Sequence, residues 1–513
     1  MEGRPMKTRA GERAMAESCV VARREFIRAG AAFAGLASCG FDVVARTCAA
    51  PTLRLGILAD THIRLHPAAV AWTKKFEAAL RRFDAEKVDA VLVAGDLTDF
   101  GLVPELKAFA DIWYKVFPDD RRSDGAHVEK LFIYGDHDTQ EIYKRLKPGL
   151  NGYPFSAEEI AKMAIVNNDR AALWKEMFRE DWAPVVKKTV NGYDFVLVHH
   201  AWGEPDNKWG SRAPAMKPFY DGYRPDPSRP FFHVQHRVCR NTVYWPEQAP
   251  GTFDDGASTE ILSRFPNCFA LCGHGHKFFN NERTMWQGAF TCCEIPGLSY
   301  VSVFAGRENC AFSDAQKKAA EAAGRVPQMK AVPGGGAGWS EAQGMIMDVL
   351  GDKIVLHRID FEAPAPELFG PDWVVPLPLG KEKPFDFAVM EARLDVPQFP
   401  KGAKVEIKKT TGKNRKGEET EQFVVSFPTV LASATGPRAF DYEVAVAGKD
   451  GTKVVKRVYS PKYWRAESAE PNTSECVFAK SELPKGKIRF AVRPANSFGK
   501  AGKAIGCEWS AKM

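Results

Sequence analysis

Aspartate and histidine recur at five places along the chain, and each time they follow a short apolar run. The first place is Asp60-Thr61-His62, which closes the run from residue 53 to residue 59. Short hydrophobic runs bounded by polar residues are typical of buried strands. Because side chains two apart in an extended chain face the same way, Asp60 and His62 could bind one cation. Four later segments repeat this pattern: Gly95-Asp96-Leu97-Thr98-Asp99, Gly135-Asp136-His137-Asp138, His236 and Gly273-His274-Gly275-His276.

The sequence between these clusters predicts the elements that would position them. Apolar residues recur from 70 to 83 at the spacing of an amphipathic helix, and a second such segment runs from 104 to 116. Strands that alternate with helices predict crossover units, in which helices cover a largely parallel sheet. In open sheets of this class, ligands bind outside the carboxyl ends of the strands. We therefore expect the five strand ends to converge on one crevice.

The five segments, in this order, resemble the motifs of the calcineurin-like metallophosphoesterases, a family of dinuclear metal enzymes. The resemblance implies an α/β fold over residues 51–362, a four-layer α-β-β-α sandwich. It also implies two metal ions bridged by Asp96. The remaining ligands would be Asp60, His62 and His276 at the first metal, and Asp136, His236 and His274 at the second.

The chemistry implied by this ligand set is the hydrolysis of a phosphate ester. Mixed oxygen and imidazole ligands suit manganese, iron or zinc better than magnesium or calcium. Two such metals about 3.5–4 Å apart clamp an in-line displacement at phosphorus and supply metal-bound hydroxide near neutral pH. His137 matches the family histidine that contacts the phosphate and helps the leaving group depart, because an alkoxide leaves poorly without a proton donor.

The third motif departs from the usual family pattern. The family usually has Gly-Asn-His-Asp or Gly-Asn-His-Glu, whereas this chain has Asp136 in place of the asparagine. A carboxylate still coordinates through oxygen, but it adds a negative charge. That charge would hold the cation more tightly and weaken its Lewis acidity. We expect an intact site with a shift in metal identity or rate.

Two segments compete for the fourth motif, since both His199-His200 and His236 end strands. From His236, one loop, one helix and one strand lead to Gly273, whereas an extra strand intervenes after His199. The family places its histidine one crossover unit before the Gly-His-x-His pair, which favours His236. His199 and His200 would then line the substrate pocket, or they would be ordinary hydrogen-bonded histidines.

Residues 1–50 are expected to be an export signal. Arg23-Arg24-Glu25-Phe26-Ile27-Arg28 resembles a twin-arginine motif and precedes a short apolar segment, residues 29–37. Cleavage after Ala50 competes with lipidation of Cys39, because Leu36-Ala37-Ser38-Cys39 resembles a lipobox. The alternative is a disordered basic tail. The sequence thus predicts a periplasmic or cell-envelope protein, and no other stretch is long and apolar enough to span a membrane.

The pattern changes after residue 362. Residues 363–384 are rich in proline and are expected to form a linker. Residues 385–513 contain only short strand patterns, which predict a small all-β, immunoglobulin-like sandwich. The segments 442–446 and 490–499 resemble a fibronectin type III module. Such a domain could contact a cell surface or a glycan.

Composition excludes little, but it argues against a nucleic-acid partner. The charge of +7 is spread over 513 residues and lies partly in the leader. The basic segment 401–416 lacks the interleaved aromatic residues of a nucleic-acid site. Of the eleven cysteines, the eight beyond the leader show no paired zinc-finger spacing. Cys268 and Cys272 are expected in the core, and Cys476 and Cys507 could form a disulfide in an oxidising compartment.

Taken together, the sequence predicts an exported dinuclear-metal phosphoesterase that hydrolyses a phosphate mono- or diester of a small molecule or lipid. The alternative is a catalytically degenerate protein of the same fold, which would present its sandwich domain to a surface or glycan partner. The complete ligand set favours the enzyme, because charged ligands are costly to bury once their metal is lost.

Overall fold

The computed structural model describes residues 50–65, 70–146, 153–200, 213–244, 253–277, 279, 281–302, 307, 338–339, 342–361, 367–368, 372–413, 418–430, 439–460 and 473–510. The predicted export signal lies outside the described residues apart from Ala50. None of the helices within the described ranges has the length and apolar character needed to cross a membrane.

The first sheet carries the first three of the motif-bearing strands. Its order is β14 (Glu367–Leu368), β13 (Lys353–Asp360), β12 (Gln343–Val349), β1 (Leu53–Leu58), β2 (Ala90–Ala94) and β3 (Glu129–Ile133), with β15 (Trp373–Pro376) also paired to β13. The strands β1, β2 and β3 run parallel, and the hairpin β12–β13 joins β1 antiparallel. All five residues of β2 are buried, as expected for a parallel strand covered on both faces.

The second sheet carries the last two motif-bearing strands. Its order is β4 (Val185–Val190), β5 (Tyr193–Val198), β6 (Phe231–Gln235), β7 (Cys268–Cys272), β9 (Thr291–Glu294) and β8 (Met285–Gln287). The four inner strands run parallel, and the two edge strands are antiparallel to their neighbours. The motifs are therefore divided between two mixed sheets, whereas crossover reasoning alone predicts one.

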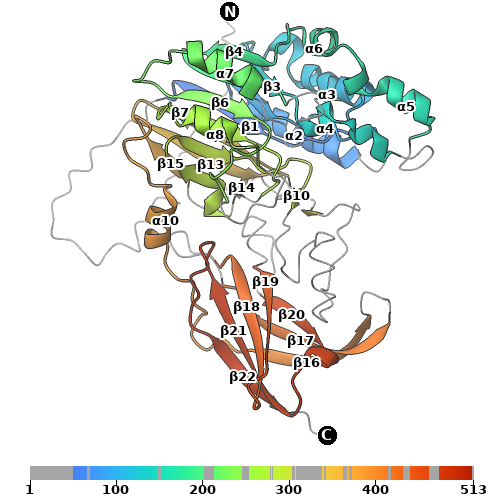
Figure 1. Ribbon diagram of the computed structural model, residues 1–513, viewed down its shortest axis with the longest axis vertical. Coiled ribbons are helices and arrows are strands. Elements are labelled where there is room, and N and C mark those ends of the chain that lie inside the picture. The colour runs from blue at the N-terminus through green and yellow to red at the C-terminus, as the bar shows by residue number, and fades with distance from the viewer. Residues whose placement is uncertain are drawn as a thin grey trace, which may run out of the picture. The chain divides into compact units, whose positions relative to one another are not determined.

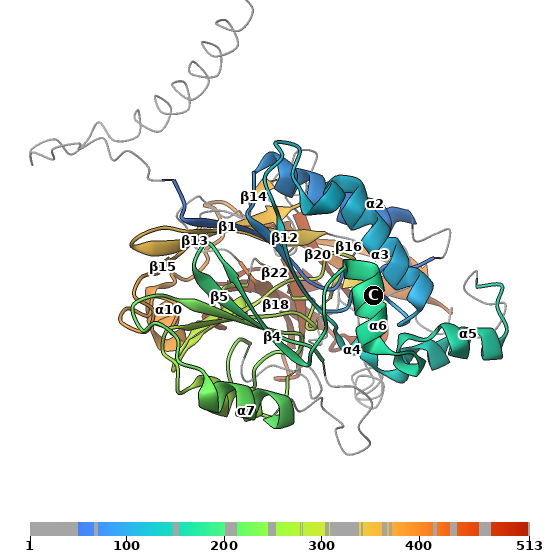
Figure 2. The same ribbon diagram turned by 90° about the horizontal axis from the view of Figure 1, so that it is seen from above.

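The two sheets pack face to face between outer helices, which gives the four layers implied by the resemblance (Figure 2). The core between the sheets contains Ile57 and Met347 from the first sheet and Phe195 and Phe269 from the second. The helices α2 (Val70–Ala85) and α3 (Val103–Val116) cover the outer face of the first sheet, and α7 (Ala213–Gly222) and α8 (Ala257–Leu262) cover the second. The predicted fold class is confirmed.

Helix α2 shows why these residues form these layers. Its buried side chains Phe76, Ala79, Leu80 and Phe83 fall at the i, i+3, i+4, i+7 spacing of one helix face. They pack in the same cluster as Val91 and Val93 of β2. Helix α2 thus presses its apolar face on the strand that leads to Asp96.

Short helices follow β3, and the first of them contains the third motif. They are α4 (Asp136–Thr139), α5 (Ala157–Met163) and α6 (Arg170–Phe178), with 3-10 turns η3 (Glu141–Arg145) and η4 (Ile165–Asn167) between them. The remaining short elements of this part are η2 (Pro118–Asp120), η5 (Glu282–Thr284), β10 (Val301–Ser302) and β11 (Gly338–Trp339).

The segment predicted as a linker, residues 363–384, contributes strands to the first sheet instead. Both β14 and β15 pair with β13. Proline is compatible with strands at a sheet edge, where one side of the backbone needs no ladder partner, so the composition does not exclude a strand. Helix α10 (Phe387–Arg393) follows, and its Met390 is buried in the core between the two sheets. Residues 385–393, which we expected in the sandwich domain, therefore pack with the preceding domain.

The remaining residues form two antiparallel sheets, which confirms the all-β prediction (Figure 1). One sheet has the order β16 (Glu406–Lys413), β17 (Glu419–Pro428) and β20 (Thr473–Ala479), and the other has the order β19 (Lys453–Tyr459), β18 (Asp441–Gly448), β21 (Lys487–Ala495) and β22 (Ile505–Ser510). The turn η8 (Lys480–Glu482) follows β20. Val425, Tyr442 and Phe490 lie in the core of this domain. Cys476 and Cys507 are free thiols, so the disulfide considered from the sequence is not formed.

Candidate metal centre

The predicted ligands lie where the strands end, in backbone conformations that ordinary residues seldom adopt. Strand β1 ends at Leu58, and φ is +54° at Asp60 and +45° at His62. The same left-handed conformation occurs at Asp96, His274 and His276, with φ of +52°, +72° and +52°. It costs roughly 1–2 kcal/mol per residue and gathers at functional sites. Asp60 and His62 therefore meet through a left-handed turn, not through the extended alternation that we expected.

Gly95 also has a left-handed conformation, and a larger residue would not fit there. Its φ is +89°, and a Cβ built there would lie 2.4 Å from Nδ1 of His236. A side chain at this position would push the imidazole of His236 away from Asp96. The glycine before Asp96 thus lets two strand ends from different sheets approach each other.

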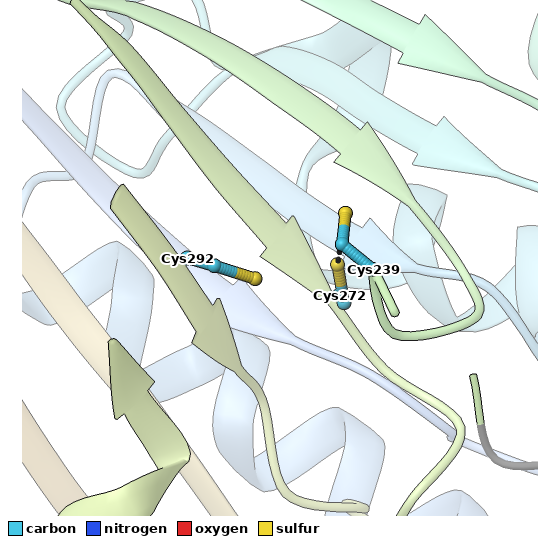
Figure 3. Close-up of side chains that lie close together, drawn as sticks. All are labelled: Cys239, Cys272 and Cys292. Carbon is cyan, nitrogen blue, oxygen red and sulfur yellow. Dashed lines mark hydrogen bonds between the residues drawn. The ribbon is translucent and has the colours of Figure 1, made fainter. Parts of the chain in front are cut away.

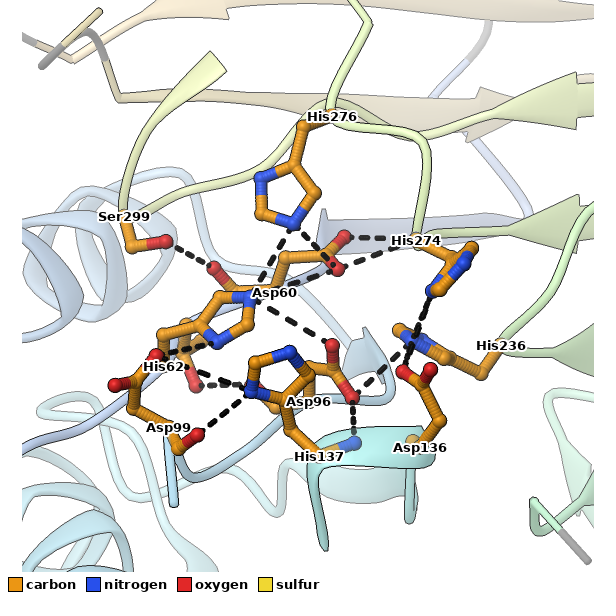
Figure 4. A network of polar contacts seen from close by, with 12 residues as sticks. Asp60, His62, Asp96, Asp99, Asp136, His137, His236, His274, His276 and Ser299 are labelled. Carbon is orange, nitrogen blue, oxygen red and sulfur yellow. Dashed lines mark hydrogen bonds and ion pairs between the residues drawn. The ribbon is translucent and has the colours of Figure 1, made fainter. Parts of the chain in front are cut away.

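The first group of side chains is Asp60, His62 and His276, whose ligand atoms lie within 4.8 Å of one another (Figure 4). Nε2 of His276 is 3.1 Å from Oδ1 of Asp60 and 3.2 Å from Nε2 of His62. All three residues are buried.

The second group is Asp96, Asp136, His236 and His274, which also lie within 4.8 Å of one another. Nε2 of His236 is 3.1 Å from both Oδ1 of Asp96 and Oδ1 of Asp136. Nδ1 of His274 is 3.2 Å from Oδ1 of Asp136. Asp96 faces both groups, because its other oxygen, Oδ2, is 3.6 Å from Nε2 of His62. That is the placement required of a bridging carboxylate.

The protonation of the imidazoles shows that these groups suit cations. Nδ1 of His276 donates to the Tyr300 carbonyl at 2.9 Å, and Nδ1 of His236 donates to the Ala94 carbonyl at 2.8 Å. In a neutral imidazole, Nε2 is then an unprotonated acceptor. Both Nε2 atoms nevertheless face carboxylate oxygens. Acceptors that face each other at this separation repel unless a proton or a metal cation lies between them.

The distances also fit a transition metal. Nitrogen and oxygen ligands bind such ions at about 2.0–2.2 Å, so two ligand atoms at right angles on one ion lie about 3 Å apart. The contacts of 3.1–3.2 Å within each group match that spacing. The residues present therefore fit two bound ions.

His137 lies at the rim of the centre and is more accessible than the predicted ligands beside it. Its side chain is 21 % exposed, and its ring nitrogen Nδ1 donates to the Asp99 carbonyl at 2.6 Å. Since Nδ1 is engaged with this carbonyl, Nε2 of His137 is the ring nitrogen that can contact a substrate. Burial lowers the pKa of His137, but the negative charges of Asp96, Asp136 and Asp99 outweigh it and raise that pKa to about 9.

Two further aspartates hold the motif loops. Oδ1 of Asp99 lies 3.1 Å from Nδ1 of His62, which directs Nε2 of that ring into the first group. Asp138 is fully buried and accepts the backbone N–H groups of Gly135, Leu97 and Thr98, so it ties the second and third motifs together. Burial raises the pKa of Asp138 to about 6. Such orienting contacts are typical of groups just behind metal ligands.

Arg237 was not singled out from the sequence, yet it contacts the centre directly. Its Nη2 donates to Oδ2 of Asp136 at 3.0 Å, and the side chain is buried. The additional negative charge of Asp136 relative to asparagine is thus paired with a positive charge from the residue after His236. Nε and Nη1 of Arg237 make no hydrogen bond to the described residues.

Glu294 is a second residue that sequence reasoning missed. Its carboxylate lies directly behind the last motif, because a Cβ built on Gly275 would be 1.8 Å from its Oε1. Glu294 is fully buried, and burial together with the Asp60 charge raises its pKa to about 8 despite Lys277. Gly275 between the two motif histidines is therefore needed for space.

The structure separates the two candidates for the fourth motif. His236 lies in the second group, whereas Nδ1 of His199 accepts the backbone N–H of Tyr134 at 3.0 Å. His200 is buried beside the centre: its ring centroid is 6.3 Å from that of His236, and its Nε2 is 3.4 Å from the Gln140 amide nitrogen. His199 is thus engaged with the backbone, and His200 is the nearer of the two to the centre.

Two aromatic residues and one basic residue flank the first group. Tyr300 stacks on His276 with ring centroids 4.3 Å apart, and Trp72 lies 6.0 Å from Tyr300. The Arg64 guanidinium lies 4.3 Å from the Trp72 ring centroid and pairs with Asp99. No signal in the sequence marks these residues, because Tyr300 joins the others only through the fold.

Comparison with known proteins supports the resemblance of the five motifs to those of the calcineurin-like metallophosphoesterases. Residues 53–278 match the family model of calcineurin-like phosphoesterases. A search of curated proteins gave no match.

Several solved structures are similar to the chain. A dimetal phosphatase from Danio rerio shares 9 % identity over 64 % of this chain and 99 % of that chain, with a TM-score of 0.33. GAP50, the anchor in the inner membrane complex of Plasmodium, shares 10 % identity over 64 % of this chain and 90 % of its own, with a TM-score of 0.33. Vps29 from Entamoeba histolytica in complex with zinc shares 10 % identity over 63 % and 99 %, with a TM-score of 0.25.

Proposed function

We propose that the chain is an exported, metal-dependent hydrolase of a phosphate mono- or diester, with a small-molecule or lipid substrate. The observation that carries the proposal is the position of Asp96, whose two oxygens face separate groups of aspartate and histidine side chains. When bound there, two ions of manganese, iron or zinc would neutralise charge on the phosphoryl oxygens and lower the pKa of water.

The chain's own residues would hold and orient the reacting groups. Asp60, His62 and His276 would bind one ion and Asp136, His236 and His274 the other, with Asp96 shared. His137 has Nε2 available at the rim and would donate to the departing oxygen. His200, beside His236, would contact the substrate. Arg237 would fix Asp136 and offset its charge.

The test combines metal analysis with hydrolysis assays on the purified chain. Reconstitution with manganese, iron or zinc should give at least two ions per chain and turnover of p-nitrophenyl phosphate or bis-p-nitrophenyl phosphate. Asp96→Asn should lose both ions and activity, because one carboxylate serves both sites. A folded chain that binds no metal and hydrolyses neither substrate would support the alternative, a degenerate protein that presents its sandwich domain to a surface or glycan partner.

Export is proposed from the twin-arginine resemblance alone. Replacement of Arg23 and Arg24 by lysine should leave the protein in the cytoplasm of a bacterial host, and cell fractionation measures this. Loss of lipid labelling in a Cys39→Ala variant would identify lipidation at that residue, whereas an unlabelled wild-type chain that is still exported would indicate cleavage without a lipid.

A further inference from the structure

Three cysteine side chains meet in the second sheet, outside the aspartate and histidine centre (Figure 3). Cys239 lies in the loop after β6, Cys272 ends β7 and Cys292 lies on β9. All three are fully buried, and their sulfur atoms lie within 4.8 Å of one another. The strands β6, β7 and β9 are neighbours in the sheet, so three separate segments bring the thiols together.

The sulfur spacing suits shared ligation of an ion. The sulfur atoms of Cys239 and Cys272 are 4.0 Å apart. Zinc–sulfur bonds of about 2.3 Å place two sulfurs on one ion about 3.8–4.0 Å apart, for tetrahedral or trigonal angles. A disulfide requires about 2.05 Å. The third sulfur, within 4.8 Å, needs to move by less than about 1 Å to complete the site.

The surroundings of the thiols hold them in place. The Thr242 hydroxyl donates to the Cys239 carbonyl at 2.6 Å and lies 3.5 Å from the sulfur of Cys292. It thereby fixes the loop after β6 against β9.

A buried carboxylate lies next to the same loop. The backbone N–H of Asp254 donates to the carbonyl of Val238, which precedes Cys239. Its side chain is buried, and its donors among the described residues are neutral groups: the backbone N–H of Arg240 and of Gly256 and the Gln235 amide. Buried charges are normally paired, so a positive ion nearby would complete this arrangement.

We propose that Cys239, Cys272 and Cys292 bind a structural metal ion of the soft d10 class, Zn²⁺ or Cu⁺. Thiolate ligands select these ions, and the thiol protons are released to solvent on binding. The ion would join the loop three residues after His236 to the strand end two residues before His274. It would therefore hold together the two segments that carry His236 and His274, which are ligands of the proposed catalytic centre.

Cobalt distinguishes this site from the catalytic one. Co²⁺ bound by thiolates gives an intense sulfur-to-metal charge-transfer band in the near ultraviolet, which aspartate and imidazole ligands do not give. The full chain, stripped with chelator under anaerobic conditions and titrated with Co²⁺, should show this band. Zn²⁺ is then added to one sample of the Co²⁺-loaded chain and Cu⁺ to another. The loss of the band and metal analysis show which of the two ions displaces Co²⁺.

Cysteines in the same strands supply matched controls. Cys292→Ser should abolish the band and remove one ion per chain, whereas Cys293→Ser should leave both unchanged, since Cys293 faces the core between the sheets. Cys268→Ser is a second control, because Cys268 shares β7 with Cys272 but lies outside the thiol group. Asp96→Asn should keep the band.

Two results would overturn the proposal. One is a wild-type chain without a charge-transfer band at saturating Co²⁺, a result that needs no variant to fold. The other is a band of equal intensity in Cys292→Ser and wild type, which would assign the signal to other thiols.

Discussion

Asp136 and Arg237 form a buried charge pair that explains how this centre accommodates a carboxylate in place of an amide. The guanidinium donates to the oxygen that does not face His236, so Oδ1 stays directed at the second group. Asp136 and Arg237 are therefore one unit, and each side chain has a physical reason to require the other.

The pair gives a prediction about Asp136→Asn, the residue usual in the family motif. This change should destabilise the metal-free protein by about 3–5 kcal/mol, because it leaves Arg237 buried without a counter-charge. Arg237→Gln in the same chain should recover a large part of the loss. Urea unfolding of the wild type, both single variants and the double variant in chelator measures the coupling. Additive single effects would show that the two side chains do not act together.

His137 gives a second prediction at this scale. His137→Ala should reduce kcat on an alkyl phosphate by about 10²–10⁴-fold, because the alkoxide then leaves without a proton donor. Turnover of p-nitrophenyl phosphate should fall much less, since nitrophenolate leaves unaided. Metal content should not change. His127→Ala, at an exposed histidine, is the control. Equal losses on both substrates would show that His137 does not assist the leaving group.

At the scale of elements, charged side chains link three strands of the first sheet on the face turned away from the core between the two sheets. Arg54 of β1 donates to both oxygens of Asp348 on β12, at 2.7 Å each. His357 of β13 lies 3.4 Å from Asp348 and 2.9 Å from Asp372, which precedes β15. Hydrogen bonds to Asp348 and then Asp372 raise the pKa of His357 to about 9.

The raised pKa makes the attachment of β13 depend on pH. A histidine whose pKa is higher in the folded than in the unfolded protein stabilises the fold fully below about pH 6.5. That contribution is lost as the pH rises through about 9. We expect His357→Gln to cost about 1 kcal/mol at pH 6, after solvent screening, and almost nothing at pH 10. Denaturant unfolding of both proteins across this range measures the difference. A constant difference at every pH would contradict the assignment.

The elements also show what the sequence could predict and what it could not. The strands that lead to Asp60, Asp96 and His236 follow from their apolar runs, and the count of crossover units favours His236, which lies beside Asp136, over His199. The strands β14 and β15 could not be predicted, because the prolines in and around them resemble a linker and β15 pairs with β13, the second strand before it in the chain.

Contacts between residues far apart in the sequence could not be predicted either. Arg237 contacts a residue 101 positions away, and Cys239 lies 33 positions from Cys272. Neither separation forms a motif. The left-handed turns at Asp60 and His62 could not be predicted for a different reason: aspartate and histidine usually have negative φ, so their presence does not indicate a left-handed conformation as a glycine does.

At the scale of the whole molecule, the proposed ions would stabilise the domain that holds them. Asp60, Asp96 and Asp136 are buried close together and carry like charges, and Arg237 pairs with the charge of Asp136. A ligand that binds only the folded state at 100 times its Kd adds about 2.7 kcal/mol per site. Removing metal should therefore expose the repulsion among these carboxylates.

We expect chelation to lower the Tm of the full chain by roughly 5–10 °C and readdition of manganese, iron or zinc to restore it. Differential scanning calorimetry measures the shift. The sandwich domain has its own core, built from residues such as Val425 and Phe490, so its melting should not respond to chelator. Asp96→Asn, which removes the shared carboxylate, should show a smaller chelator-induced shift than the wild type, because only the ion proposed at the cysteine group is left to remove. If chelator leaves the wild-type Tm unchanged while metal analysis shows that the ions are gone, the two groups do not hold the domain together through bound cations.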